Sequence, residues 1–147
     1  MAQQGQTPTS ALDGALARVG DRWSFLVVEA LLDGPRRFND IAAAVPGIAP
    51  NILTDRLRRL GREGVVVSRA YQERPPRHDY ALTDDGRELA GVLRLLAAWG
   101  SSGAAAGAQV GVALRHVVCG SALEARWYCP TCARTVDDDD ASSLTFA

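Results

Sequence analysis

The sequence predicts a mainly α-helical fold with one small β-hairpin, followed by a short C-terminal metal-binding knuckle pair. Three observations lead to this prediction. Apolar residues recur at helical spacing as far as Leu60, and the spacing changes to two after Gly64. All three cysteines lie in the last thirty residues, beside one of only two histidines. The expected order is helix, helix, short helix, helix, hairpin and helix, and then the cysteine-rich segment.

Two helices are expected at the start of the main domain. The first begins at about Leu12 and keeps apolar residues at helical spacing up to Val19, where a Gly-Asp pair interrupts it. The second is the strongly apolar stretch 23–32, which ends at an Asp-Gly-Pro sequence. Both patterns indicate helices that bury one face.

Two further helices precede the hairpin. Asn39 is the expected N-cap of a short helix over residues 40–44, which a Pro-Gly pair closes. Pro50 suits the first position of the next helix, because its missing N–H is not needed there. That helix ends in the region of Gly61 and Gly64. The apolar residues on its buried face are Leu53, Leu57 and Leu60.

After Gly64 the alternation predicts a strand with Val65, Val67, Arg69 and Tyr71 on one face and Val66, Ser68 and Ala70 on the other. Residues 72–77 are expected to form a loop, because two prolines do not fit inside a ladder. Tyr80 and Leu82 indicate a short return strand. Thr83 is expected to cap the final helix, which reaches Trp99 and carries two acidic residues in its first turn.

Five segments are expected along the chain. Residues 1–10 form a flexible polar tail, and residues 11–100 form the main domain. Residues 101–113 are rich in Gly and Ala, which is typical of a flexible linker. Residues 114–136 hold the Cys/His cluster as a zinc-ribbon-like segment. Residues 137–147 begin with four consecutive aspartates and are expected to be an acidic flexible tail.

The composition excludes several classes of protein. The chain has 147 residues, of which 47% are hydrophobic and 22% charged, as in ordinary globular domains. No apolar run approaches the ~18–20 residues that cross a bilayer, and the N-terminus lacks the features of a secretory signal. We therefore expect a cytoplasmic protein with no membrane partner. The chain is not expected to be an enzyme, because it shows no nucleophile–base set, phosphate-binding glycine loop or paired catalytic carboxylates.

Two short helices, a tight turn and a hairpin together describe a winged helix-turn-helix, in which the helix from Pro50 is the recognition helix. In the major groove, Arg binds guanine and Asn binds adenine through two hydrogen bonds. Residues 49–78 hold seven arginines against three acidic residues, a net charge of +4, although the whole chain carries −1. This concentration favours phosphate contacts, whereas an arginine-rich face alone would be only a solvated surface. The expected DNA-binding residues are Asn51, Thr54, Asp55, Arg56, Arg58, Arg59, Arg74 and Arg77.

The last helix of the main domain is apolar on more than one face. Such a helix must be buried on both faces, and a domain of about ninety residues has too little core to cover them. A second copy of the chain is therefore the expected partner, with the first helix beside the last. Two symmetric recognition helices would then contact half-sites about 34 Å apart. The expected dimer-interface residues are Leu12, Leu16, Leu89, Val92, Leu93, Leu96 and Trp99.

The cysteine cluster has the spacing of a metal site. His116 and Cys119 form one pair and Cys129 and Cys132 another, each with two residues between its members. Two such turns complete a tetrahedron, and their soft ligands favour structural zinc, or iron in a reducing cell. A segment this short cannot fold on its own core, so the metal would stabilise it. Two alternatives remain, a redox-active Cys129/Cys132 pair and three thiols without a role.

The sequence resembles the HxlR-type winged-helix transcriptional regulators of bacteria. The resemblance rests on ALARVGDRWSFLVVEALLDGPRRFNDI, PGIAPNILTDRLRRLGREGVV, YQERPPRHDYALTDDGRELAGVL and AAWG, which cover about nine-tenths of the main domain. It implies a homodimeric DNA-binding regulator, usually a repressor and sometimes an activator. Many relatives sense oxidants through a cysteine shortly before the first helix, where this chain has Ser10. Asp55 stands where relatives often carry an uncharged polar residue.

The function expected from these observations is sequence-specific transcriptional regulation, as a repressor, by a homodimer on a pseudo-palindromic operator. The expected partners are double-stranded DNA, a second copy of the chain and a small-molecule effector of undetermined identity. Two alternatives belong to other classes. One is a thiol-based redox-sensing regulator that uses Cys129 and Cys132. The other is a winged-helix module that docks onto protein and does not bind DNA.

Overall fold

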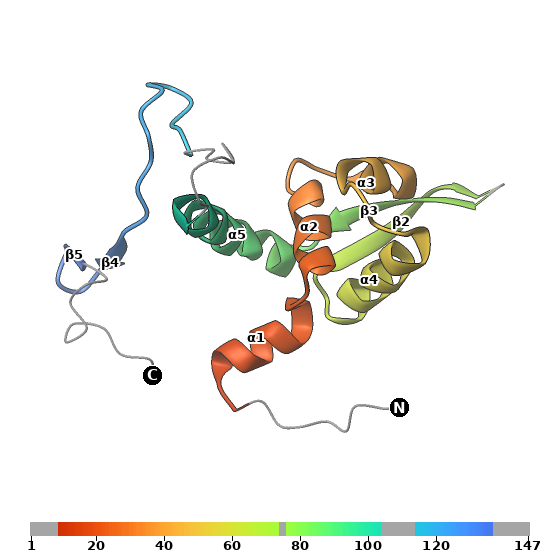
Figure 1. Cartoon of the computed structure of the whole chain (residues 1–147), viewed down its shortest axis with the longest axis horizontal. Coiled ribbons are helices and arrows are strands. Elements are labelled where there is room, and N and C mark those ends of the chain that lie inside the picture. The colour runs from red at the N-terminus through yellow and green to blue at the C-terminus, as the bar shows by residue number, and fades with distance from the viewer. Residues whose placement is uncertain (1–8, 74–75, 104–113, 137–147) are drawn as a thin grey trace. The chain divides into compact units, whose positions relative to one another are not determined.

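The computed structural model describes residues 9–73, 76–103 and 114–136, and divides the chain into two compact units, 1–93 and 94–147 (Figure 1). The first unit contains the predicted helix-turn-helix and hairpin. No helix in the described ranges is long and apolar enough to cross a membrane. The elements are α1 (Ala11–Val19), α2 (Arg22–Leu31), β1 (Arg36–Arg37), α3 (Phe38–Ala44), α4 (Pro50–Arg62), β2 (Val66–Glu73), β3 (Pro76–Leu82), α5 (Asp84–Gly103), β4 (Trp127–Cys129) and β5 (Arg134–Val136).

The helices begin where their capping residues predict. The Ser10 side chain accepts a hydrogen bond from Asp13 N at the start of α1, and Pro50 occupies the first turn of α4. At the start of α5, Gly86 N donates to Thr83 Oγ1 at 3.0 Å, which confirms the predicted cap. Each cap satisfies a backbone N–H that has no partner within the helix.

The predicted N-cap of the third helix is wrong. The structure starts α3 at Phe38, with Arg37 as its N-cap, and Asp40 Oδ2 accepts from Arg37 N at 3.3 Å. The cause is a strand that we did not predict. Arg36 and Arg37 form β1, which pairs antiparallel with Tyr80 and Asp79 of β3. The backbone therefore stays extended up to Phe38 and turns into the helix directly.

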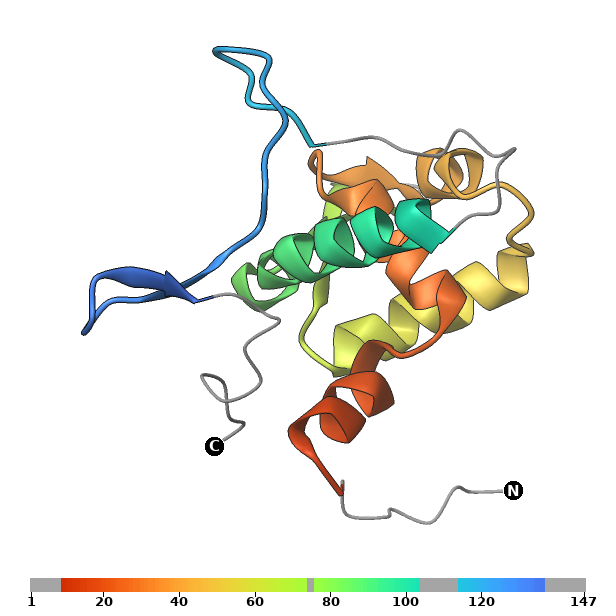
Figure 2. The same cartoon turned by 60° about the vertical axis from the view of Figure 1, so that its left-hand side comes forward.

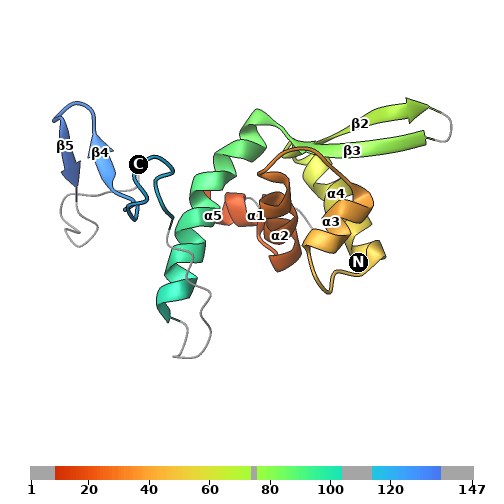
Figure 3. The ribbon, with the colours of Figure 1, turned by 90° about the horizontal axis from the view of Figure 1, so that it is seen from above.

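The sheet has three strands in the order β1-β3-β2, and its hairpin is longer than we predicted. Pairing continues to Glu73 and Pro76, so most of the expected loop 72–77 is strand and only residues 74–75 lie outside the described residues. Pro76 is tolerated because it is the first residue of its strand. The hairpin extends past α3 and α4 as a wing (Figures 1 and 3).

The core of the first unit lies where the helices meet the base of the hairpin. The apolar faces predicted for the second and fourth helices are buried there, together with one residue from α3 and the two ends of the hairpin. This fixes α4 with its opposite face outward. The largest fully buried side chains include Val27, Val28, Leu31, Ile41, Leu53, Leu60 and Val65.

One carboxylate connects two of the helices, and one of its arginine partners reaches a third. Asp21 caps α2, because its Oδ1 accepts from Trp23 N and Ser24 N at 3.1 Å and its Oδ2 accepts from the buried Ser24 hydroxyl at 2.6 Å. The same carboxylate lies 3.0 Å from Arg56 Nε and 3.7 Å from Arg59 Nη1, both on α4. Arg59 also donates to the carbonyl oxygen of Ala17 in α1, which lies beside the C-terminal end of α4 (Figure 2).

We expect the Asp21→Ala substitution to lower the free energy of unfolding by about 2–4 kcal/mol. Losing a helix cap costs about 1 kcal/mol, and hydrogen bonds to a charged group are worth about 1.5–3 kcal/mol. The Asp21→Asn substitution keeps an acceptor for the cap and should cost less. Urea unfolding measures both values. Asp33→Ala, which removes an exposed carboxylate 3.5 Å from Arg36, is the control and should have little effect.

The pH dependence of this difference has a definite sign. Burial raises the pKa of Asp21, but hydrogen bonds from Ser24 and the charges of Arg56 and Arg59 outweigh it and lower the pKa below 3.8. The carboxylate therefore stabilises the fold above about pH 4, and this contribution is lost as the pH falls through the lowered pKa. The gap in unfolding free energy between wild type and Asp21→Asn should shrink in acid. A gap independent of pH would contradict the assignment.

Two glycines of α5 should respond oppositely to alanine. A Cβ on Gly86 would lie 2.2 Å from the carbonyl oxygen of Val65, so Gly86→Ala should cost about 1–3 kcal/mol of stability. A Cβ on Gly91 would meet no atom within 4 Å, so Gly91→Ala should stabilise the helix by about 0.5–1 kcal/mol. Thermal and urea unfolding compare the two variants, and equal effects would contradict the close packing at Gly86.

Candidate nucleic-acid interface

The outward face of α4 carries a stripe of polar residues. Asn51, Asp55, Arg58 and Arg62 follow one another at spacings of four, three and four residues, and all four are exposed. This spacing places them on one face of the helix, opposite the buried leucines. Residues in this arrangement can contact successive base pairs and the flanking phosphates when a helix lies in the major groove.

The arginines of this stripe are not neutralised within the chain. Among the described residues, neither Arg58 nor Arg62 has a carboxylate within ion-pair distance, and Asp55 likewise has no cationic partner there. Thr54, beside the stripe, donates its hydroxyl proton to the carbonyl oxygen of Pro50 at 2.9 Å. Its oxygen can still accept a hydrogen bond, and its methyl group is available for apolar contact.

Two of the predicted DNA-binding residues do not lie on the outward stripe of α4. Arg56 and Arg59 are half-buried and point toward Asp21, as their ion-pair distances show. Their positive charges are thus compensated between α4 and the N-terminal end of α2. We leave both residues out of the interface proposed below, because a guanidinium held in this way contributes to packing and not to a free basic surface.

The wing contributes further arginines. Arg77 of β3 is exposed, whereas Arg74, the other predicted wing residue, has a side chain outside the described residues. Arg69 of β2 is also exposed and lies opposite Asp79 in the ladder, with no ion pair to it. We did not predict Arg69 as a DNA-binding residue, although the alternation of the strand already places it on the same face as Val67. We therefore add Arg69 to the candidate surface.

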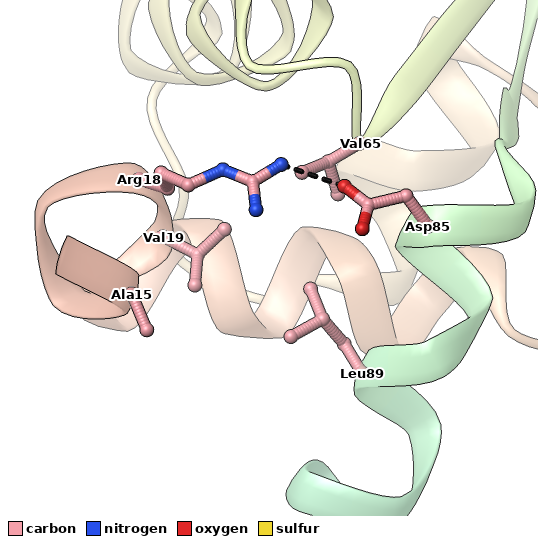
Figure 4. Close-up of a pocket in the computed structure, with 6 residues that line it drawn as sticks. All are labelled: Ala15, Arg18, Val19, Val65, Asp85 and Leu89. Carbon is pink, nitrogen blue, oxygen red and sulfur yellow. Dashed lines mark hydrogen bonds and ion pairs between the residues drawn. The ribbon is translucent and has the colours of Figure 1, made fainter. Parts of the chain in front are cut away.

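A hollow between α1, α5 and the start of β2 is too small for an effector. It is lined by Ala15, Arg18, Val19, Val65, Asp85 and Leu89 (Figure 4) and has a volume of about 50 Å³. Pockets for small molecules usually measure about 300–1,000 Å³. Arg18 closes the hollow by donating to Asp85 Oδ2 at 2.6 Å and to the carbonyl oxygen of Glu63 at 2.8 Å. The contact therefore joins α1 to α5 and the end of α4.

The predicted dimer-interface residues fall into two groups. Leu89 and Leu93 of α5 pack against the core of their own chain. The remaining ones are exposed, and so is Leu95, which we did not predict at this interface. Within α5 the exposed residues lie at helical spacing on a face next to the one that meets the core. The exposed apolar residues of the two helices are Leu12, Leu16, Val92, Leu95, Leu96 and Trp99.

The predicted metal ligands come together in pairs. His116 Nδ1 lies 3.2 Å from Cys119 Sγ, and the side chains of Cys129 and Cys132 are near enough to shift each other's pKa in opposite directions. All three cysteines are free thiols. In the part of the chain that the structure describes, no three His, Cys, Asp or Glu side chains converge on one point. The structure thus brings the four residues together as two separate pairs, one in each turn.

Hydrogen bonds shift the acidity of these thiols. The Ser121 side chain and backbone, followed by His116, lower the pKa of Cys119 to about 7. Hydrogen bonds from the Cys132 backbone and side chain, with the Thr131 backbone, lower the pKa of Cys129, and the hydrogen bond to Cys129 and its charge raise the pKa of Cys132. Each turn therefore directs hydrogen-bond donors at one sulfur atom, which favours the thiolate that metals bind.

Comparison with known proteins gives one consistent result. The HxlR-like helix-turn-helix family matches residues 18–107. The HTH-type transcriptional regulator YodB of Bacillus subtilis is 33% identical over 95 residues, covering 65% of this chain and 85% of that protein. The uncharacterized HTH-type transcriptional regulator Rv3095 of Mycobacterium tuberculosis is 34% identical over 122 residues, covering 83% and 77%. The redox regulator HypR in its oxidized form has a TM-score of 0.61 at 30% identity, covering 65% of this chain and 99% of that one.

Proposed function

The chain belongs to the HxlR-like helix-turn-helix family of DNA-binding transcriptional regulators, and from that premise we propose that it is a sequence-specific repressor that binds a pseudo-palindromic operator as a homodimer. The observation that carries this proposal is the exposed stripe on α4, with its unneutralised Arg58 and Arg62. The relatives are named as transcriptional regulators and not as enzymes. No catalytic role is therefore assigned to any residue.

Each residue of the stripe has a chemical role in DNA binding. Asn51 forms two hydrogen bonds to adenine, and Arg58 forms two to guanine, in the major groove. Arg62, at the C-terminal end of the helix, contacts a phosphate, as do Arg69 and Arg77 on the wing. The phosphate contacts supply affinity that falls with salt, whereas the base contacts select the sequence.

Asp55 makes the stripe selective. A carboxylate in the major groove is repelled by phosphates and accepts a hydrogen bond from the amino group of cytosine. In the part of the helix face that the structure describes, no cation neutralises it. We therefore assign Asp55 to a hydrogen bond with the amino group of cytosine. This bond offsets the repulsion between the carboxylate and the phosphates only at a base pair that presents cytosine there.

The homodimer follows from the exposed apolar residues of α1 and α5. Trp99 is 76% exposed and Leu12 68%, and the other members of the set are exposed by about half. Along α5, Val92, Leu95, Leu96 and Trp99 form a continuous apolar stripe. A second copy of the chain, related to the first by a two-fold axis, covers this stripe with its own. Repression follows when the bound dimer excludes polymerase from an overlapping promoter.

A redox-sensing regulator remains the second candidate function. The specific observation in its favour is that Cys129 and Cys132 lie on one tight turn, where the pKa of Cys129 is lowered and that of Cys132 is raised by their mutual interaction. Oxidation of this pair to a disulfide would then change DNA affinity. A protein-docking module is the third class and predicts no salt-dependent DNA affinity. Titration of the promoter DNA with the reduced and the diamide-treated protein separates the three candidates.

The Arg58→Ala substitution should weaken binding to the operator and relax selection at one base pair, since one bidentate base contact is worth about 1–3 kcal/mol of discrimination. Arg77→Ala should weaken binding to all sequences alike and reduce the slope of log K against log salt by about 0.9. Fluorescence anisotropy at several salt concentrations measures both effects on operator and scrambled DNA.

The matched control is Arg87→Ala, which removes an exposed arginine that pairs with Asp84 on α5 at 2.9 Å. This variant should bind DNA as the wild type does. If the Arg58 and Arg87 variants lost the same affinity, only the net charge of the chain would matter, and the proposed interface on α4 would be wrong.

The Leu96→Glu substitution should convert the dimer to a monomer and reduce operator affinity at least tenfold, because it places a charge in the proposed apolar interface. The side chain does not belong to the core of its own chain, so circular dichroism should be unchanged. Analytical ultracentrifugation measures the oligomeric state. Glu88→Gln, an exposed substitution on the same helix, is the control. A wild-type protein that sediments as a monomer would contradict the proposal.

A further inference from the structure

The C-terminal segment consists of two hairpins with the same construction. In the first, Leu123 N donates to Leu114 O at 2.7 Å, Arg115 pairs with Ala122, and His116 N donates to Ser121 O at 2.9 Å. In the second, Trp127 pairs with Val136, Tyr128 with Thr135 and Cys129 with Arg134. Each pair of the second hairpin lies thirteen residues after its counterpart in the first. The segment is thus a structural repeat that the sequence did not reveal.

The turns of the two hairpins also correspond. His116 and Cys119 hold the first and fourth positions of one turn, and Cys129 and Cys132 hold the same positions of the other. The fifth residue of each turn has a left-handed backbone, with φ of 71° at Gly120 and 53° at Ala133. Among the described residues, Ala133 is the one non-glycine residue with positive φ. An alanine seldom adopts this conformation, so the turn geometry is imposed by the rest of the hairpin.

The donor atoms within each turn are close enough to share one ion. His116 Nδ1 lies 3.2 Å from Cys119 Sγ. Two ligands of a tetrahedral zinc ion lie about 3.6 Å apart when the Zn–S and Zn–N bonds are about 2.3 Å and 2.0–2.1 Å long. The thiols of Cys129 and Cys132 hold the same two turn positions and interact closely enough to shift each other's pKa in opposite directions. Each turn is therefore a bidentate half of a metal site.

The hairpins have no apolar core to stabilise them. Of residues 114–136, all are exposed except Cys129 and Val136, which are intermediate. Val117 is 98% exposed and Val118 86%. Isolated two-stranded hairpins are marginally stable in water at best. The turns therefore need a stabilising interaction other than burial, and a shared metal ion supplies one where apolar area does not.

We propose that the two hairpins bind one structural Zn²⁺ ion through His116, Cys119, Cys129 and Cys132. The ion then joins the two copies of the structural repeat into one unit. Three thiolates and one imidazole are a ligand set typical of structural zinc. Only residues 124–126 connect the two hairpins, so both pairs of donor atoms belong to one short segment. Among the described residues the two pairs do not converge on one point, so the proposal requires the two hairpins to come together around the ion. This inference does not depend on the proposed DNA-binding function.

The full-length protein, purified with reductant, tests this proposal by its metal content and by titration with Co²⁺. We expect one zinc ion per chain by elemental analysis. Replacement by Co²⁺ should give the visible absorption of a tetrahedral site and a thiolate-to-metal charge-transfer band. A thiol reagent should react with the cysteines slowly until a chelator is added. His116→Ala and Cys119→Ser should each weaken zinc binding at least tenfold.

The matched control is His78→Ala, which replaces the other histidine of the chain and should leave zinc binding unchanged. Three results would overturn the proposal. One is a purified protein that holds no metal and does not take up Zn²⁺ or Co²⁺. Another is equal loss of zinc in the His78 and His116 variants. The last is a Cys129–Cys132 disulfide found by mass spectrometry under reducing purification, which would favour the redox pair.

Discussion

The geometry of the first unit depends on the carboxylate of Asp21. It caps α2, satisfies the buried Ser24 hydroxyl and holds Arg56 and Arg59 of α4 at 3.0 and 3.7 Å. A helix that packs by a leucine stripe alone can rotate about its axis by small amounts. The two ion pairs on one flank limit that rotation. They therefore reinforce the orientation that the buried leucines impose, in which Asn51, Asp55, Arg58 and Arg62 face outward.

This constraint divides the arginines of the chain into two kinds. Some are compensated inside the fold, as Arg18 is by Asp85 and Glu63, and Arg56 is by Asp21. Others, such as Arg58 and Arg69, have no carboxylate partner among the described residues and remain available to phosphates. Because Asp21 compensates the charges of Arg56 and Arg59, the net charge of +4 over residues 49–78 overstates the positive charge that is available to DNA. The free charge is nevertheless on the outward face of α4 and on the wing.

Most of the first unit could be predicted from the sequence, because local signals specify its elements. Helical spacing located α1, α2 and α4, and Thr83 marked the start of α5. What the sequence did not predict depends on contacts between distant residues. The short strand β1 exists only because β3 pairs with it, and a two-residue strand has no periodicity to detect. The inward direction of Arg56 and Arg59 likewise depends on Asp21, which precedes α2.

In the C-terminal segment, still less of the structure could be predicted from the sequence. The ligand spacing could be found in the sequence, but the repeat of the two hairpins could not, because LRHVVCGSAL and WYCPTCARTV share an identical residue only at Cys119 and Cys132. The hairpin requires only a residue in the left-handed region after the fourth position, and backbone pairing that any side chains allow. Two segments with such different residues share one backbone geometry because each needs only cross-strand pairing and a left-handed residue at the same place in its turn.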